Sequence, residues 1–186
     1  MIKVLTQVAI LSACTLALGA CTLGQGGSTA AAPTKAAAPD YQAPSPPPPP
    51  AGQIRAICYS EADITHVRSR MVQQELQVIT LQCQSGGGKR AYERTYADFV
   101  GKFRAEFATN ARALSQIAAR KRLNVDTLVT EIANRTAQRA QVDKEFCSRG
   151  KRAFDWALDA KVTSLAQVPP PYDVGPDMNI WPCPAQ

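Results

Sequence analysis

The stretch 92-YERTYADFVGKFRAEF-107 carries the clearest periodic pattern in the chain. Its aromatic residues recur at steps of four, three, four and four, which places them on one face of an α-helix, and Leu114 and Ile117 extend that face. An aromatic face of this length predicts a helix in the core of a bundle; a ligand-stacking surface is the alternative. Gly101 lies off this face and marks either close packing or a kink. The face consists of Tyr92, Tyr96, Phe99, Phe103 and Phe107.

An amphipathic helix precedes this stretch, from Ser60 to about residue 85. Ser60 fits the N-cap, and Asp63 occupies the capping-box position three residues on. Residues 86–88 are all glycine and end the helix. They do not form a phosphate-binding loop, because the positions that a Walker motif requires as Gly and Ser/Thr hold Cys83 and Arg90. The apolar stripe of this helix consists of Ile64, Val67, Met71, Val72, Leu76, Ile79 and Cys83.

Two further helices follow the turn Arg120-Lys121-Arg122. The first is expected over about residues 125–140, and Asp143 is expected to cap the second, which continues to about Leu165 and is stopped by the prolines at 169–171. The tail from residue 172 is Pro-rich and irregular, yet apolar enough to pack back on the helices. The predicted fold is therefore all-α, an antiparallel bundle of about four helices, within a domain of residues 54–186.

Residues 22–53 are almost entirely Gly, Ala, Ser, Thr and Pro. Such a composition cannot bury enough apolar surface to fold, so a disordered tether is predicted, with an extended polyproline II run over residues 44–50. The tether would hold the domain away from a membrane. Recognition of the proline run by a partner is the alternative.

The chain begins with one basic residue, Lys3, and an apolar run from Val4 to Ala20, which are the parts of a secretory signal. The run ends in 18-LGAC-21, a stretch that resembles the lipobox of bacterial lipoproteins. The resemblance implies a signal peptide of residues 1–20, a lipidated Cys21 and a periplasm-facing anchor in the cell envelope. Thr22 in place of Asp favours the outer membrane over the inner.

Three alternatives to this anchor stay open. The stretch 11-LSAC-14 also fits a lipobox, although cleavage there leaves a shorter apolar region. Ordinary secretion after Ala20 is the second alternative and an uncleaved anchor the third. The apolar run is shorter than the roughly 20 residues of a typical membrane-spanning helix.

Cysteine usage agrees with an oxidising compartment. Of the six cysteines, Cys14 lies in the signal and Cys21 would carry the lipid, which leaves four for two disulfides. A continuous first helix separates Cys58 from Cys83 by roughly 30–35 Å, too far to bridge. In an up-and-down bundle one pair lies at each end, and we predict Cys83–Cys147 and Cys58–Cys183. Without a CxxC pair and with a single histidine, no metal site is expected.

The helical core, with its aromatic face and its paired Cys83 and Cys147, is similar to small, functionally uncharacterised envelope proteins of proteobacteria. This resemblance covers about residues 60–166. It implies no catalytic residue.

The net charge of +6 becomes +5 once Lys3 is removed with the signal. Export from the cytoplasm argues against nucleic acid as the partner of this basic domain. Anionic lipid and an acidic protein remain as candidate partners. The turn of Arg120, Lys121 and Arg122 lies at the end where the tether enters, and we expect it to contact the membrane. The alternative is that these residues only balance the dipole of the preceding helix.

No catalytic constellation is recognisable. His66 is the only histidine, with Asp63 one helical turn before it, and no nucleophile is aligned with the pair. We therefore expect a non-enzymatic lipoprotein without a cofactor, a tethered helical module that interacts with another envelope protein. The alternative is a small-ligand binder or enzyme with a pocket near Tyr92, Tyr96 and Phe99.

Overall fold

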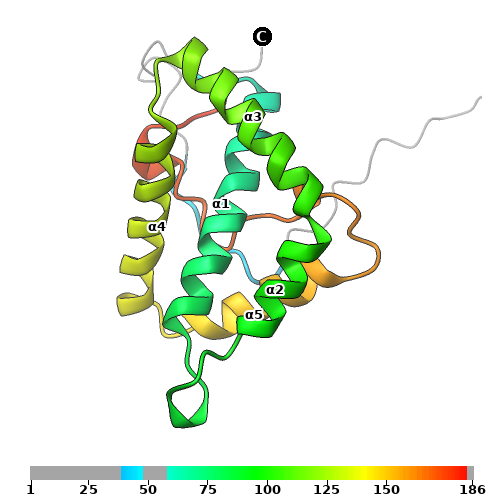
Figure 1. The fold of residues 1–186 in the computed structure, drawn as a ribbon. Coiled ribbons are helices and arrows are strands. Elements are labelled where there is room, and N and C mark those ends of the chain that lie inside the picture. The colour runs from blue at the N-terminus through cyan, green and yellow to red at the C-terminus, as the bar shows by residue number, and fades with distance from the viewer. Residues whose placement is uncertain (1–38, 48–57, 184–186) are drawn as a thin grey trace, which may run out of the picture. The chain divides into compact units, whose positions relative to one another are not determined.

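The structure, a computed structural model, describes residues 39–47 and 58–183. Five α-helices form within these residues, and no β-strand does, apart from isolated bridges between Tyr59 and Pro182 and between Gln84 and Arg90. The prediction of an all-α fold is confirmed (Figure 1). The helices are α1 (Glu61–Gln82), α2 (Glu93–Lys102), α3 (Arg104–Lys121), α4 (Val125–Val142) and α5 (Phe146–Leu158), with short 3-10 turns η2 (Gly86–Gly88), η3 (Leu165–Gln167) and η4 (Pro176–Met178).

Helix α1 lies in the centre of the fold and packs against α3, α4 and α5. Helices α2 and α3 return antiparallel to α1, and α4 then runs in the direction of α1 (Figure 1). Helix α5 is short and crosses the end of the bundle where α1 and α4 finish. This arrangement defines two ends of the molecule, which we call the Cys58 end, where α1 begins, and the α5 end.

The beginning of α1 follows the sequence signal. The Ser60 hydroxyl accepts a hydrogen bond from the Asp63 backbone N–H at 3.2 Å, as an N-cap does. The predicted apolar stripe of α1 is buried along its length. Gly150 of α5 lies directly against the side chain of Ile79, and a Cβ at position 150 would overlap it. Helix α5 therefore packs on α1 at a distance that only glycine permits.

The predicted second helix is two helices. The chain leaves helical geometry at Phe103 (φ −104°, ψ 15°), between α2 and α3. Gly101 has no neighbour within 4 Å of where a Cβ would lie, so close packing does not explain it. Its low helix propensity favours a break nearby, which agrees with the alternative of a kink. The break does not disturb the aromatic face, since Phe99 and Phe103 are both buried with ring centroids 5.3 Å apart.

The last predicted helix is too long. Helix α5 ends at Leu158, well before the prolines at 169–171. Two interactions explain the early end. Lys102 donates hydrogen bonds to the carbonyls of Ala157 and Asp159, and Ser164 forms a capping box with Gln167 that begins η3 instead.

The predicted cap of α5 is also wrong. Asp143 ends α4, and Glu145 is the N-cap of α5 without a side-chain hydrogen bond. The Asp143 carboxylate instead accepts from the Glu145 backbone N–H at 2.8 Å, within the turn between the two helices.

Residues 39–47, which we call the strap, correct the predicted extent of the tether. Tyr41 is 1% exposed, and its hydroxyl donates to the Pro169 carbonyl at 2.9 Å. The Ala43 N–H donates to the Pro171 carbonyl at 2.9 Å. The strap therefore belongs to the folded unit, although its composition predicts otherwise. The rest of the predicted tether lies outside the described residues.

The C-terminal tail packs back on the helices, as predicted. Tyr172, Val174 and Ile180 are buried, and the N–H groups of Tyr59 and Cys183 bond the carbonyls of Trp181 and Tyr59, respectively. Among the described residues, no helix combines the length and apolarity that crossing a membrane requires.

Candidate functional site

The four cysteines of the described residues form the two predicted pairs. Cys83 and Cys147 are joined at the α5 end, with Cα atoms 5.7 Å apart. Cys58 and Cys183 are joined at the opposite end, with Cα atoms 4.7 Å apart. The predicted lipidation site, Cys21, lies outside the described residues.

The basic turn is largely engaged within the protein. Arg120 bonds the Asp63 carboxylate at 2.7 Å. Lys121 donates to the Cys58 carbonyl at 2.7 Å, and its ammonium lies 5.6 Å from the centre of the Tyr59 ring. Arg122 is exposed at the left-handed C-cap of α3. The three residues lie at the Cys58 end, as predicted, but two of them stabilise that end directly.

His66 has no carboxylate partner of the expected kind. Asp63 pairs with Arg120, and the His66 backbone carbonyl accepts from the Asn110 side-chain N–H at 2.8 Å. His66 lines an open cavity of about 270 Å³ with Asn110, Glu106 and residues of η3. Neither Ser69 nor Thr65 of this cavity is directed at the imidazole, because each hydroxyl bonds a carbonyl of α1 four residues earlier.

The aromatic face of α2 and α3 packs in the core. Phe99 lies within 5.3–6.2 Å of the rings of Tyr96, Phe103, Phe107 and Phe154, measured between ring centroids. The cavities that lie in the described part of the chain, of about 230 to 530 Å³, are lined by other residues. The face therefore acts as a packing surface, with Phe99 and Phe103 buried and the other three rings partly buried against the core.

A buried polar cluster beneath the strap was not predicted. Arg149 donates from Nε to the Asp143 carboxylate at 3.0 Å and from Nη1 to the Tyr41 carbonyl at 2.6 Å. The Tyr172 hydroxyl donates to the same Asp143 carboxylate at 2.7 Å, and the Tyr172 N–H donates to Glu75 Oε2 at 2.8 Å. The cluster joins α1, the turn before α5, the strap and the tail. We call these five residues the clamp.

The two acids of the clamp are in opposite electrostatic states. Burial raises the pKa of Glu75 well above its ordinary value, because the side chain is 0% exposed and Oε1 has no hydrogen-bond partner among the described residues. Burial by itself also raises the pKa of Asp143. The hydrogen bonds from Tyr172, the Glu145 N–H and Arg149 outweigh it, so the pKa of Asp143 lies below its ordinary value. Burial therefore favours the neutral form of Glu75, whereas hydrogen bonds favour the charged form of Asp143.

The clamp holds separate segments of the chain together through its hydrogen bonds. The guanidinium of Arg149 is committed to Asp143 and the Tyr41 carbonyl, and the Tyr172 hydroxyl is committed to Asp143. Asp143, Arg149 and Tyr172 of the clamp also line a neighbouring open cavity of about 420 Å³. One sequence signal could have revealed the clamp, since Glu75 and Arg149 both interrupt apolar stripes at inward positions.

The part of the chain that the structure describes contains no group of three or more His, Cys, Asp or Glu placed to hold a metal ion. Comparisons with protein-family models, curated proteins and solved structures find no match for this chain. Function is therefore inferred from the residues and their geometry.

Proposed function

We propose that this chain is a non-enzymatic lipoprotein of the cell envelope, anchored through Cys21, whose helical domain faces the periplasm and interacts with another envelope protein. The observation that carries the proposal is the state of the cysteines. All four within the described residues are paired in disulfides, which is typical of proteins that mature in an oxidising compartment. The lipobox-like stretch 18-LGAC-21 supports the same compartment.

The strap supports a tethered domain. Its Tyr41 is buried, its carbonyl accepts a hydrogen bond from Arg149, and its hydroxyl donates one to the Pro169 carbonyl. The strap is therefore attached to the domain by non-covalent contacts as well as by the continuity of the chain. A pull on the anchor is therefore transmitted to the core through the clamp. We place the anchor in the outer membrane by the same resemblance, on the basis of Thr22.

Metabolic labelling in a bacterial host tests the anchor. Wild-type protein and the matched control Cys14→Ser are expected to incorporate labelled palmitate and to sediment with membranes. Cys21→Ser is expected to lose both the label and the membrane association. Labelled Cys21→Ser protein would contradict the proposal, and loss of label only in Cys14→Ser would move the anchor to the other cysteine.

In-cell photo-crosslinking tests the protein partner. A crosslinking side chain is placed at the exposed α4 positions Thr130 and Asn134, with the buried Ile132 as control. Further variants then carry the crosslinking side chain at exposed positions of the other helices. A defined adduct from one helix face, absent from the buried position, is expected. Absence of any adduct from all exposed helix faces would contradict an interaction module.

A further inference from the structure

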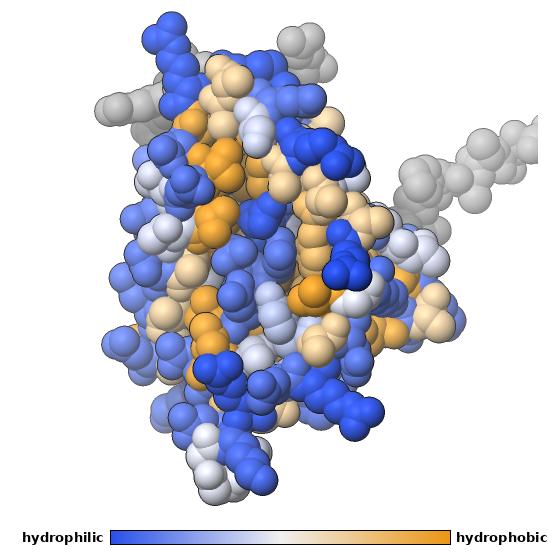
Figure 2. Space-filling model, in the orientation of Figure 1, coloured by the Kyte–Doolittle hydropathy of each residue, from blue (hydrophilic) through white to orange (hydrophobic). Residues whose placement is uncertain are grey.

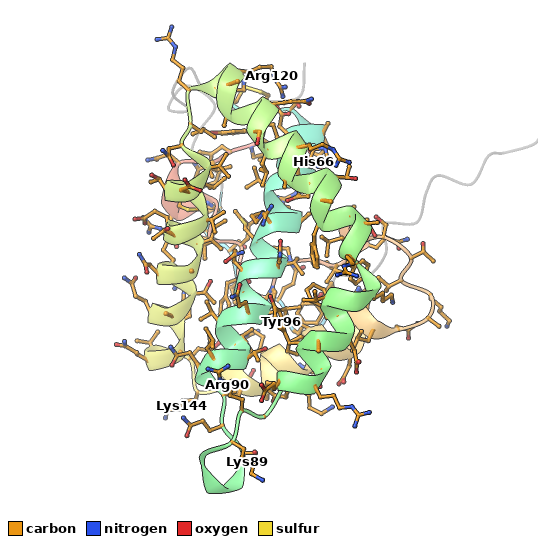
Figure 3. The ribbon with its side chains drawn as sticks, in the orientation of Figure 1. His66, Lys89, Arg90, Tyr96, Arg120 and Lys144 are labelled. Carbon is orange, nitrogen blue, oxygen red and sulfur yellow. A yellow bond between two sulfur atoms is a disulfide. The ribbon has the colours of Figure 1, made fainter. Side chains whose placement is uncertain are left out.

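The α5 end carries a surface that neither the clamp nor the helix packing uses. It is formed by the ends of α1 and α4, the loop between α1 and α2, and the turn before α5 (Figure 3). Arg120 lies at the opposite end of the molecule. We call this the Lys89 surface, which consists of Leu81, Lys89, Arg90, Val142 and Lys144.

The basic residues of the Lys89 surface are exposed and outside every salt bridge that the described residues form. Acids in the turn before α5 and in α5 itself are paired with other cations. The ion pairs are Asp143–Arg149, Glu145–Arg149, Glu145–Arg152 and Asp155–Lys151. Glu93, in the first turn of α2, is the neighbouring acid outside these pairs, and Arg94 follows it directly. The surface is therefore a net positive region.

The loop that carries Lys89 and Arg90 has a defined backbone conformation. Gly87 and Gly88 have positive φ values of 78° and 75°, which only glycine adopts readily. Ser85 bonds the Lys89 carbonyl through its N–H at 2.8 Å, and the Gln84–Arg90 bridge closes the loop. The result is a hydrogen-bonded loop that projects beyond the ends of the helices (Figure 1).

Exposed apolar side chains lie at the same end. Leu81 is 47% exposed in the last turn of α1, and Val142 is 75% exposed as the last residue of α4. Figure 2 shows hydrophobic side chains at the lower end of α1, beside the hydrophilic loop. Aliphatic side chains ringed by Lys and Arg are typical of surfaces that enter the lipid head-group region.

The chain also enters the folded unit at the α5 end. Asp40 pairs with Arg152 of α5 at 3.8 Å, and the Tyr41 ring lies 6.3 Å from that of Trp156. The strap then runs toward the Cys58 end, where Pro46 lines a cavity with Ile64. The described part of the chain therefore begins beside α5, at the same end of the folded unit as the Lys89 surface.

We propose that the Lys89 surface docks on anionic lipid head groups, with Leu81 and Val142 entering the interface. The docking orientation rests on the proposed lipid anchor, whereas the affinity of the surface for lipid does not. Lys89, Arg90 and Lys144 replace the basic turn at residues 120–122 as the membrane contact, because Arg120 and Lys121 are engaged within the protein.

Vesicle flotation with residues 22–186, made without the lipid, tests the proposal. The protein is expected to float with phosphatidylglycerol-containing phosphatidylethanolamine vesicles and to stay behind with phosphatidylcholine-containing ones, and added salt is expected to release it. Replacing Lys89, Arg90 and Lys144 with Gln is expected to weaken binding about 100-fold, about fivefold per residue. Val142→Ser with Leu81→Ser is expected to weaken it about tenfold.

The matched control replaces Arg104, Arg112 and Arg122, exposed cations of α3 and its C-cap, with Gln. It is expected to bind within about twofold of the wild type, since these residues lie away from the surface. The proposal would be overturned if the wild type did not float with the anionic vesicles, which is the result expected if the surface binds an acidic protein instead. Equal losses of binding in the two triple variants would also overturn it. Because the lipid is absent, a failed palmitate label at Cys21 leaves this result unchanged, and the two proposals fail separately.

Discussion

The two ends of the bundle are built alike and use their charges differently. Each end has one disulfide: Cys58, just before α1, is joined to Cys183 in the tail, and Cys83, the C-cap of α1, is joined to Cys147 in α5. At the Cys58 end the basic side chains of Arg120 and Lys121 bond protein groups. At the α5 end Lys89 and Arg90 are exposed outside any ion pair of the described residues, and the nearby acids Asp143 and Glu145 pair with other cations. The comparison teaches that a run of basic residues in sequence does not identify the basic surface of the fold.

The reason is the local supply of acceptors. The C-terminus of α3 meets the N-terminus of α1, which offers the Asp63 carboxylate and the Cys58 carbonyl. The α5 end has acids too, but Asp143 and Glu145 are both paired with Arg149 of the clamp. The cations of the Lys89 surface are left for solvent or a partner.

Removing a disulfide is expected to have the largest effect on the free energy of unfolding and to show that both ends depend on their cross-link. Cys83→Ser with Cys147→Ser opens a loop with a sequence separation of 64, and Cys58→Ser with Cys183→Ser opens one of 125. Each is expected to lower the free energy of unfolding by about 4 to 5 kcal/mol, slightly more for the longer loop. Urea denaturation monitored by circular dichroism measures both. A large effect at one end only would break the likeness of the two ends.

Truncating Tyr41 is expected to have the next largest effect. Tyr41→Ala removes a fully buried ring and the hydroxyl that bonds Pro169, and should cost about 3 kcal/mol. Hydrogen exchange of the backbone N–H groups of residues 172–174 should accelerate with it. Asp40→Ala, one residue away and exposed, is the control and should stay within about 0.5 kcal/mol of the wild type. Equal stability of the two variants would contradict a docked strap.

Neutralising the cations separates the two ends most directly. Arg120→Gln and Lys121→Gln should each lower the free energy of unfolding by about 1 kcal/mol, because each loses a bond to the protein. Lys89→Gln and Arg90→Gln should change it by less than about 0.5 kcal/mol. Thermal unfolding of the four variants in parallel measures the contrast. A reversed order would mean that the α5 end uses its cations for stability.

The pH dependence of stability tests the buried acid between the ends. The folded state binds the Glu75 proton more tightly than the unfolded state, so its contribution is complete below the ordinary pKa of 4.5 and is lost as the pH rises toward the raised pKa. Glu75→Gln should remove this decline, with little change at acid pH and a gain at alkaline pH. Unfolding curves across pH measure it. A variant with the wild-type slope would show that Glu75 is not held neutral.

Regular helical spacing is the part of this fold that could be predicted. The rise of 1.5 Å per residue and short turns are enough to decide which cysteines share an end, and the structure contains both predicted pairs. The break between α2 and α3 and the end of α5 could not be predicted in this way. The break is a single non-helical residue, Phe103, and α5 ends where Lys102 of α2 bonds its last carbonyls. Local periodicity does not contain such contacts.

The sequence by itself determined the helical class, the disulfide pairs and the secretion-like N-terminus, because each depends on spacing along one chain. Only the tertiary structure decided that Tyr41 belongs to the core and that Lys89 and Arg90 are exposed outside the ion pairs of the described residues. Burial and ion pairing depend on which distant groups meet, and a proline-rich segment shows no periodicity that reveals its partner. The same kind of distant contact gives Arg120 and Lys121 partners within the protein at the Cys58 end.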